Sequence, residues 1–273
     1  MGLKLNGLIA ARPATPADLR GKAIGIDVPN LMYAFYGVRM QGPADDGRRP
    51  GAVRAAIHGV MRRANELAAW GARPVLILDG PPHALKREML VQRDATRAFP
   101  ALRRTDYAPL HDEARAARIA IIQAPHDAEA QGSAMARAGK LDVVATTDWD
   151  ALAMGAPVLL RGLSAGSGRW MLIHAETAFA KLGLTRADLC SAAVLMGCDF
   201  APGFDGIGPK RAMKLVLAHR GDDPLEGALR ALGASVDAAQ RARDARTLLL
   251  EPAHDAAPSG KTGRTAQAKL DAR

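Results

Sequence analysis

The stretch Ala124-Pro-His-Asp-Ala-Glu-Ala-Gln131, followed after a helix-length spacer by Val143-Val-Ala-Thr-Thr-Asp-Trp-Asp150, decides the fold. The run Leu141 to Ala145 is almost wholly apolar and β-branched, which predicts a buried strand. That strand would deliver Asp148 and Asp150 at its carboxyl end. Residues two apart in extended chain point the same way, so we expect both carboxylates to face one spot.

Asp127 and Glu129 are also two residues apart, but the same spacing has a different consequence in a helix. A regular helix would separate the two side chains by roughly 200°. They can converge only if Asp127 occupies a non-helical position and the helix begins at Ala128. Four carboxylates held close together repel one another unless a cation lies between them. This is the first indication of a hard divalent metal.

Bulk composition indicates an ordinary globular protein with an excess of positive charge. The chain has 273 residues, 48% hydrophobic and 24% charged, enough for one large domain or two small ones. The formal charge of +9 favours a polyanionic partner such as nucleic acid, although a generic basic protein accounts for charge alone equally well.

Cysteine usage and hydropathy exclude other classes. Cys190 and Cys198 are the two cysteines, too few for a disulfide framework or a zinc site, and we interpret both as core residues. The sequence shows no signal-peptide pattern and no apolar run near the ~20 residues of a membrane span. We expect an intracellular, soluble protein without membrane partners, nuclear if eukaryotic or cytoplasmic if prokaryotic.

Strand-like and helix-like segments alternate along the chain, which predicts an α/β fold with a mostly parallel central sheet flanked by helices. Strands are predicted at 22–27, 74–79, 119–122, 141–145, 157–160 and 170–173. Helices are predicted at 52–70, 84–99, 177–182, 186–196, from about 208 to 219, and in a segment ending near Glu251. Exposed or irregular connections are predicted at 41–51, 100–109 and 165–168.

The carboxyl ends of the strands carry acidic residues. Asp27 and Asp79 each end a strand, as the Asp148/Asp150 pair does, and sites in such sheets form at this edge. One terminal aspartate is an ordinary turn residue, whereas three strands ending this way favour a site. With Asp127, Glu129 and Asp199, the all-oxygen set selects Mg²⁺ or Mn²⁺ over zinc. Two such ions suit phosphodiester hydrolysis.

Six sequence blocks, in this order and spacing, resemble the structure-specific 5′ nucleases of the flap endonuclease and XPG type. They are Ile26-Asp-Val-Pro-Asn-Leu-Met-Tyr33, Leu78-Asp-Gly-Pro-Pro82, Ala124 to Gln131, Thr147-Asp-Trp-Asp150, Gly197-Cys-Asp-Phe200 and Gly206-Ile-Gly-Pro-Lys-Arg211. The resemblance covers roughly residues 1–255. Leu248-Leu-Leu-Glu-Pro252 resembles the closing segment of the flap endonuclease branch.

The resemblance implies a PIN-like nuclease fold and a role for each matched residue. It makes metal ligands of seven carboxylates: Asp27, Asp79, Asp127, Glu129, Asp148, Asp150 and Asp199. Asp148 is also counted as catalytic, with Lys86 and Arg93, which match a basic pair that approaches the scissile phosphate. From helical spacing alone, Lys86 and Arg93 would be a solvated helix face. Tyr33 matches an aromatic that stacks on a base, and Gly2 an N-terminal glycine near the active site.

The segment Gly206 to Arg211 resembles the family's helix-hairpin-helix-type element for duplex DNA. Gly206 and Gly208 permit close backbone approach to phosphate, the following helix presents free N–H groups, and Lys210 and Arg211 add charge. The resemblance also implies a K⁺ ion bridging this hairpin to the phosphate.

Three features depart from the family pattern. Asp127 stands where a glutamate is usual, so one ligand is a methylene shorter. The segment between Arg93 and Asp127 is short, which predicts a reduced helical arch over about 83–118. Gln267-Ala-Lys-Leu270 resembles the start of a sliding-clamp peptide but lacks its aromatic pair, so the clamp motif is incomplete.

The predicted organisation is one nuclease domain, 1–255, and a disordered tail, 256–273. The domain comprises an N-terminal part, 1–99, the reduced arch, and an internal part, 119–255, that includes the hairpin element, 199–219.

The leading hypothesis is a monomeric, metal-dependent 5′ flap endonuclease, with 5′–3′ exonuclease activity, that uses two Mg²⁺ ions, or Mn²⁺ in their place, on branched DNA in replication or repair. One rival is a DNA-binding scaffold that lost competent metal geometry through Asp127. The other is a PIN-like ribonuclease. Cleavage of flap DNA against matched RNA discriminates them.

Overall fold

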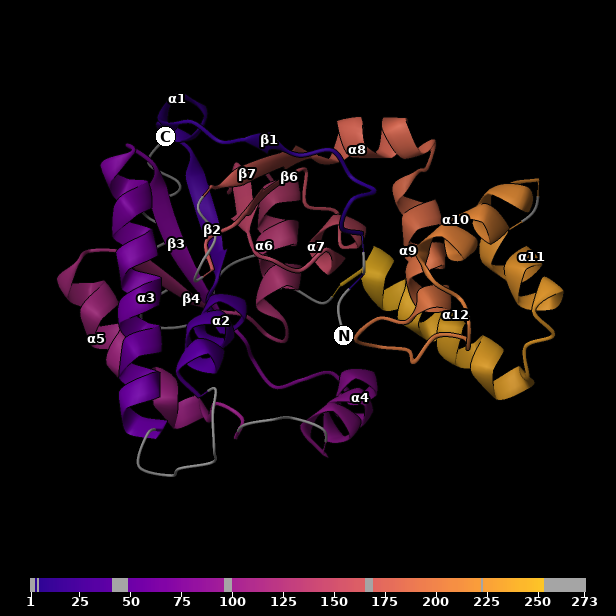
Figure 1. The fold of residues 1–273 in the computed structure, drawn as a ribbon, viewed down its shortest axis with the longest axis horizontal. Coiled ribbons are helices and arrows are strands. Elements are labelled where there is room, and N and C mark those ends of the chain that lie inside the picture. Colours follow the sequence, from indigo (N-terminus) through magenta and orange to yellow (C-terminus); the bar gives the residue numbers. More distant parts are fainter. Residues whose placement is uncertain are drawn as a thin grey trace.

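A seven-stranded sheet forms the centre of the protein (Figure 1). The computed structural model describes residues 3, 5–40, 49–95, 100–164, 169–221 and 223–252, with the side chains of 92–95 left out. Its strands are β1 (Arg12–Pro13), β2 (Ala23–Asp27), β3 (Arg73–Leu78), β4 (Ala120–Gln123), β5 (Val143–Ala145), β6 (Val158–Arg161) and β7 (Met171–His174). Their spatial order is β1-β7-β6-β5-β2-β3-β4.

The five strands from β6 to β4 pair in parallel, which confirms the mostly parallel α/β prediction. At one edge β7 runs antiparallel to β6, and β1 pairs antiparallel to β7. Strand β1, which is two residues long and contains Pro13, was not predicted from the sequence. Proline lacks a backbone donor and is tolerated at a sheet edge, where no further strand needs that bond.

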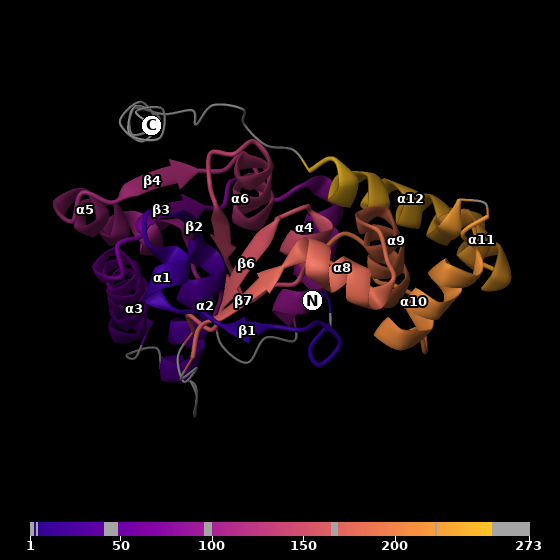
Figure 2. The same ribbon diagram turned by 90° about the horizontal axis from the view of Figure 1, so that it is seen from above.

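Helices cover both faces of the sheet and extend beyond one end of it. They are α1 (Pro16–Leu19), α2 (Val28–Met40), α3 (Arg49–Ala69), α4 (Ala84–Ala95), the 3₁₀ helix η2 (Arg104–Tyr107), α5 (Ala108–Ala116), α6 (Ala128–Arg137), α7 (Asp150–Ala153), α8 (Ala175–Leu182), α9 (Arg186–Met196), α10 (Pro209–Ala218), α11 (Pro224–Ala231) and α12 (Val236–Leu250). Figure 2 shows α3 and α6 on opposite sides of the sheet, with α9 to α12 grouped at one end. No helix in the described ranges is long and apolar enough to cross a membrane.

Alternating side chains divide the core into two apolar clusters, one on each face of the sheet. In β3, Leu76 and Leu78 belong to the cluster under α2, α3 and α5, whereas Val75 and Ile77 belong to the cluster shared with α6 and the helices α9 to α12. This is the period-two pattern of a strand buried on both faces. The buried strands thereby fix which residues reach the carboxyl edge of the sheet.

Two predicted boundaries were wrong because tertiary contacts extend helices into segments predicted as loops. Helix α3 begins at Arg49, inside the predicted loop 41–51, and Pro50 is accommodated in its first turn. Arg49 donates hydrogen bonds to the Tyr36 hydroxyl and the Ala101 carbonyl and pairs with Asp106 at 2.5 Å. Helix α5 begins at Ala108, so the predicted irregular segment 100–109 contains η2 and a helix start. The rest of the loop, 41–48, and residues 96–99, 165–168 and 253–273 lie outside the described residues.

Candidate active site

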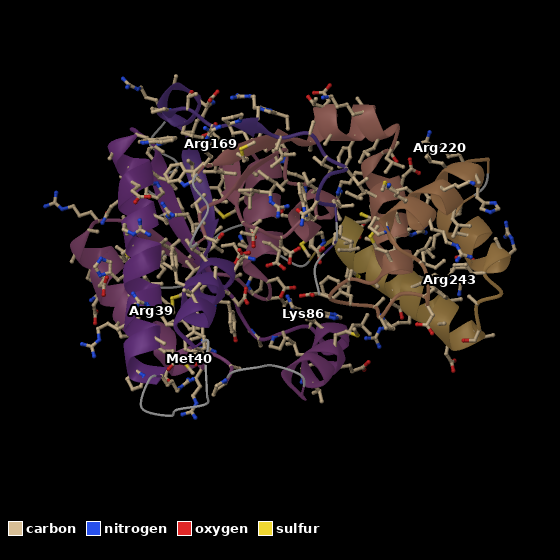
Figure 3. The ribbon with its side chains drawn as sticks, in the orientation of Figure 1. Arg39, Met40, Lys86, Arg169, Arg220 and Arg243 are labelled. Carbon is tan, nitrogen blue, oxygen red and sulfur yellow. The ribbon has the colours of Figure 1, made fainter. Side chains whose placement is uncertain are left out.

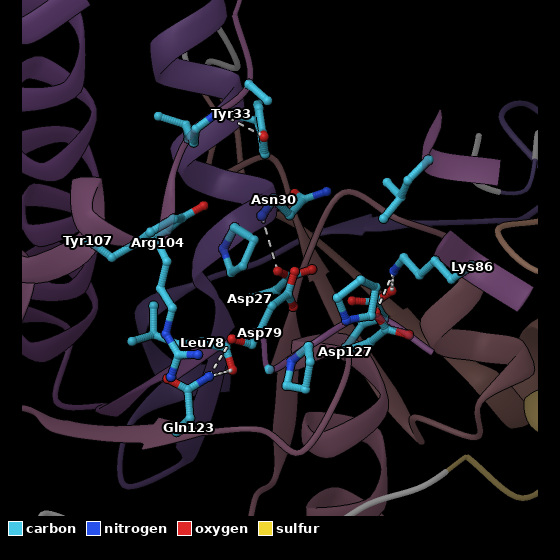
Figure 4. Close-up of a pocket in the computed structure, with 18 of the residues that line it drawn as sticks. Asp27, Asn30, Tyr33, Leu78, Asp79, Lys86, Arg104, Tyr107, Gln123 and Asp127 are labelled. Carbon is cyan, nitrogen blue, oxygen red and sulfur yellow. Dashed lines mark hydrogen bonds and ion pairs between the residues drawn. The ribbon is translucent and has the colours of Figure 1, made fainter. Parts of the chain in front are cut away.

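A cavity of about 950 Å³ opens at the carboxyl ends of β2 and β3 (Figure 4). Six of the seven predicted metal ligands line it: Asp27, Asp79, Asp127, Glu129, Asp148 and Asp199. The parallel sheet brings them together, because strands that run the same way end at the same edge. The seventh, Asp150, is buried and does not line the cavity.

Asp27 and Asp79 stand at the ends of two neighbouring strands, as predicted. Asp27 is buried, and its two oxygens accept hydrogen bonds from the Asn30 amide (3.1 Å) and the Thr146 hydroxyl (2.8 Å). Desolvation and the charge of Asp79 raise the pKa of Asp27 to about 7. Asp79 faces the open cavity and accepts a hydrogen bond from the Ala128 amide at 2.8 Å. Desolvation by the surrounding protein raises the pKa of Asp79 to about 6.

Asp127 and Glu129 converge by the route that the sequence predicted. Asp127 has extended backbone angles (φ −87°, ψ 136°) and precedes α6, whose first residue is Ala128. Glu129 lies buried in the first turn of that helix. Burial raises the pKa of Glu129 well above its ordinary value, and the charge of Asp127 adds to the shift.

Asp148 and Asp150 lie at the start of helix α7, so the prediction that this pair lies in extended chain was wrong. Strand β5 ends at Ala145, Trp149 has helical angles (φ −78°, ψ −15°), and Asp150 is the first residue of α7. The Asp148 carboxylate accepts the Asp150 amide at 3.0 Å. The reason is local: the first amides of a helix have no partner within it, and the Asp148 side chain supplies one. Burial raises the pKa of both carboxyl groups.

Lys86 provides the positive charge in the middle of this acidic site. Its ammonium lies 2.5 Å from Asp127, 3.1 Å from Asp199 and 3.6 Å from Glu129. Burial alone would lower the lysine pKa, but the carboxylates outweigh it and raise the pKa well above the ordinary value. Lys86 is therefore buried in the site and is not part of a solvated helix face. Figure 3 shows it in the interior of the molecule, while Arg220 and Arg243 lie at the outer end of the helical group.

The donor set fits a hard divalent cation. The matched ligands are carboxylate oxygens, and Asp150 has one oxygen, Oδ1, that accepts the Leu3 amide at 2.8 Å. Its other oxygen, Oδ2, is buried with no hydrogen-bond partner among the described residues. A buried carboxylate oxygen without a donor is stabilised by a cation. As the side chains stand, however, no three Asp, Glu, His or Cys residues in the described ranges come close enough to hold one ion.

Comparison with known proteins places this site in a family. Residues 118–199 match the XPG I-region, a block that contains Asp127, Glu129, Asp148 and Asp150 and ends on Asp199. The chain is 31% identical over 291 residues to flap endonuclease 1 of Methanothrix thermoacetophila, covering 93% of this chain and 84% of that protein. The chain belongs to the flap endonuclease 1 family.

Solved structures agree with the family assignment at the level of the fold. Flap endonuclease-1 from Methanococcus jannaschii superposes with a TM-score of 0.73 at 22% identity, covering 99% of this chain and 97% of that one. The catalytic core of Rad2 in complex with DNA substrate gives a TM-score of 0.70 at 22% identity, covering 90% and 83%. The predicted PIN-like nuclease fold is confirmed.

The other predicted contact residues of this flap endonuclease family member are only partly described. Arg93 lies in α4, but its side chain lies outside the described residues, as does Gly2. Tyr33 lines the cavity, and its hydroxyl accepts the Leu102 amide at 3.0 Å. The proposed stacking of Tyr33 on a base therefore stays a prediction, made for a ring that already faces the site.

The segment Gly206 to Arg211 leads into helix α10, close to the helix predicted from about 208 to 219, while the helix-hairpin-helix arrangement stays a prediction. Gly206 has φ +70°, and Gly208 occupies the position before α10 without a side chain to cap it. Lys210 and Arg211 are exposed on the first turn of that helix. The amides at the helix start are thus open to a ligand. The role of the segment Gly206 to Arg211 in DNA binding stays a prediction, and so does the binding of K⁺ there.

Sequence reasoning missed several residues that shape the flap endonuclease site. Thr146 and Asn30 fix Asp27: Asn30 lies within the block Ile26 to Tyr33 and Thr146 directly precedes the block Thr147 to Asp150, so their positions were a usable signal. Arg104 and Tyr107 line the far wall of the cavity through η2. No sequence signal pointed to these two, because η2 is held at the cavity by contacts between distant segments, among them those of Arg49 and Tyr33 with residues 101–106.

Proposed function

We propose that this protein is a metal-dependent, structure-specific 5′ nuclease that hydrolyses phosphodiester bonds in branched DNA near the junction of single strand and duplex. Flap endonuclease activity, with 5′–3′ exonuclease activity beside it, would serve DNA replication or repair. The observation that carries the proposal is the acidic cavity, with six matched carboxylates on its wall, in a member of the flap endonuclease 1 family.

The seven matched carboxylates would hold two Mg²⁺ ions, or Mn²⁺ in their place. Such ions supply a water of lowered pKa and stabilise the charge on the leaving oxygen. The protein contributes fixed oxygen positions: Asp27 is held by Asn30 and Thr146, Asp79 by the start of α6, and Asp148 by the start of α7. Carboxylates that are already oriented need no rearrangement during the reaction.

The basic residues would hold the DNA. Lys86, already at the cavity wall, and Arg93 would contact the scissile phosphate, and Tyr33 would stack on the adjacent base. Fixed positive charge near a phosphate stabilises the charge that develops on it. The open amides of α10, with Lys210, Arg211 and a K⁺ ion, would grip the duplex behind the junction.

Other partners follow from the proposed reaction. A monomer is sufficient, because all matched residues come from one chain, and a nuclease acting on cellular DNA works inside the cell. Sliding-clamp binding stays a prediction, since residues 267–270 lie outside the described residues.

The experiment that tests the proposal is cleavage of a labelled double-flap DNA with Mg²⁺ against EDTA. We expect cutting at the junction in Mg²⁺ alone and its loss in Asp148→Ala. Asp112→Ala, which removes an exposed acid from α5, is the matched control and should cut like the wild type. Tight flap binding without cutting in Mg²⁺ or Mn²⁺ would contradict the proposal, as would preferential cleavage of the matched RNA.

A further inference from the structure

Arg241 of α12 makes contacts far outside its own helix. Its Nε donates to the Phe200 carbonyl at 2.7 Å, and Nη2 donates to the Leu85 carbonyl at 3.0 Å. Its Nη1 pairs with Glu88 in α4. One guanidinium thus contacts three residues that are 41, 153 and 156 positions away in sequence, and joins α12 to two distant segments.

The two carbonyls that Arg241 holds belong to neighbours of active-site residues. Leu85 directly precedes Lys86, and Phe200 directly follows Asp199. The Lys86 ammonium and the Asp199 carboxylate are 3.1 Å apart. Arg241 therefore fixes the main chain beside both members of this pair, while its own side chain does not line the cavity.

Helix α4 buries little of its apolar surface in its described part, where Leu85 packs against the core cluster shared with α6 and the helices α9 to α12. Of its side chains that are described, 84 to 91, Lys86 alone is buried, and Val91 is 72% exposed. Figure 1 shows the helix below the sheet, beside the helical group. A helix that buries few apolar side chains gains little stability from packing. Its orientation therefore also depends on polar contacts, and in its first turns Arg241 supplies one main-chain bond, to Leu85, and an ion pair with Glu88.

Arginine suits this task because its planar group presents several donors in a rigid fork. A lysine at the same position has one ammonium and could not bond both carbonyls with the same geometry. We propose that Arg241 is a positioning residue. It holds α4 against the connection between α9 and α10, which carries Asp199, so that Lys86 faces the acidic site before DNA arrives. This inference rests on the proposed nuclease function for its consequence on the rate.

The test compares Arg241→Met with Arg243→Met. Arg243, two residues away on the same helix, pairs with Glu226 of α11 and is the matched control. Under single-turnover conditions on flap DNA, we expect Arg241→Met to lower the maximal cleavage rate by about tenfold to a hundredfold, the range that a small misplacement of a catalytic group produces. The enzyme concentration for half-saturation should stay within about twofold of the wild type.

Hydrogen–deuterium exchange gives a readout independent of activity. In the metal-free protein, Arg241→Met should speed exchange in peptides spanning 84–91, whereas Arg243→Met should leave them as in the wild type. If the wild type does not cut DNA, the proposed function is overturned, but the exchange measurement still tests whether Arg241 positions α4. Unchanged exchange across 84–91 in Arg241→Met would overturn the positioning role.

Two further variants separate the contributions. Glu88→Gln removes the ion pair but keeps both carbonyl bonds; because the Glu88 side chain is 64% exposed, we expect its rate within about twofold of the wild type. Arg241→Lys keeps the charge, and its maximal cleavage rate should fall between those of the wild type and Arg241→Met. This milder variant keeps the test usable if Arg241→Met fails to fold. A Glu88→Gln defect as large as that of Arg241→Met would overturn the main-chain explanation, as would a raised half-saturation at an unchanged rate.

Discussion

Lys86 and the carboxylates around it illustrate how single residues balance charge in a buried site. The ammonium lies within 3.6 Å of Asp127, Glu129 and Asp199, so one positive charge is shared among three of the acids. Asp27 lies outside these ion pairs and has a pKa raised to about 7 by burial and by Asp79. The folded protein therefore retains a proton on Asp27 under conditions in which the unfolded chain has lost it.

This proton gives a prediction about stability and pH in the absence of divalent ions. An unfolded aspartate has a pKa of about 4. Between that pH and about 7 the folded state binds more protons than the unfolded state, so stability falls as the pH rises through this window. We expect the melting temperature in EDTA to drop from pH 5 to pH 7, and to drop less in Asp27→Asn. Equal slopes in the two proteins would contradict the raised pKa.

The loop after β3 and the loop before α6 meet at Gly80, which sets the distance between two elements. The Gly80 amide donates to the His126 carbonyl at 2.6 Å. A Cβ at this position would lie 2.3 Å from the Pro125 carbonyl oxygen and 2.4 Å from that of Ala124. Both are main-chain atoms, so the loops themselves would have to separate, and Asp79 would move away from Asp127.

We accordingly expect Gly80→Ala to cost about 1–3 kcal/mol of unfolding free energy, the usual range for overpacking, and to slow flap cleavage by at least about tenfold. Urea unfolding and single-turnover cleavage measure the two effects. Gly51→Ala is the control, because Gly51 is exposed in the first turn of α3 and no atom lies within 4 Å of its added Cβ. A Gly80→Ala protein as stable and active as this control would show that the loops can separate freely.

At the scale of the whole molecule, the protein combines a net charge of +9 with an acidic cavity, so its acidic and basic residues lie in different regions. The acids are gathered at one edge of the sheet, whereas Lys210 and Arg211 are exposed at the start of α10, in the helical group beyond it. Phosphate contacts made by such residues release counterions, which makes DNA affinity fall with salt concentration.

The corresponding prediction concerns the salt dependence of flap binding in EDTA. Replacing Lys210 and Arg211 together by Gln should weaken binding and reduce the slope of log affinity against log salt concentration by about 2, close to one for each phosphate contact. Fluorescence anisotropy on labelled flap DNA measures the slope. Gln at Arg54 and Arg62, both exposed on α3, is the control pair and should leave it unchanged. The same loss of slope in both pairs would argue against a specific contact at α10.

The sequence by itself determined the parallel sheet, the strand-end acids and the start of α6, because apolar runs that alternate with helix-like segments, and the spacing of Asp127 and Glu129, are local patterns of a few residues. It also carried the six blocks that identify the family. Only the tertiary structure decided that Lys86 is buried among acids and that Arg241 holds Leu85 and Phe200. These features depend on contacts between segments distant in sequence, and local patterns of hydrophobicity carry no information about which distant partner a side chain meets.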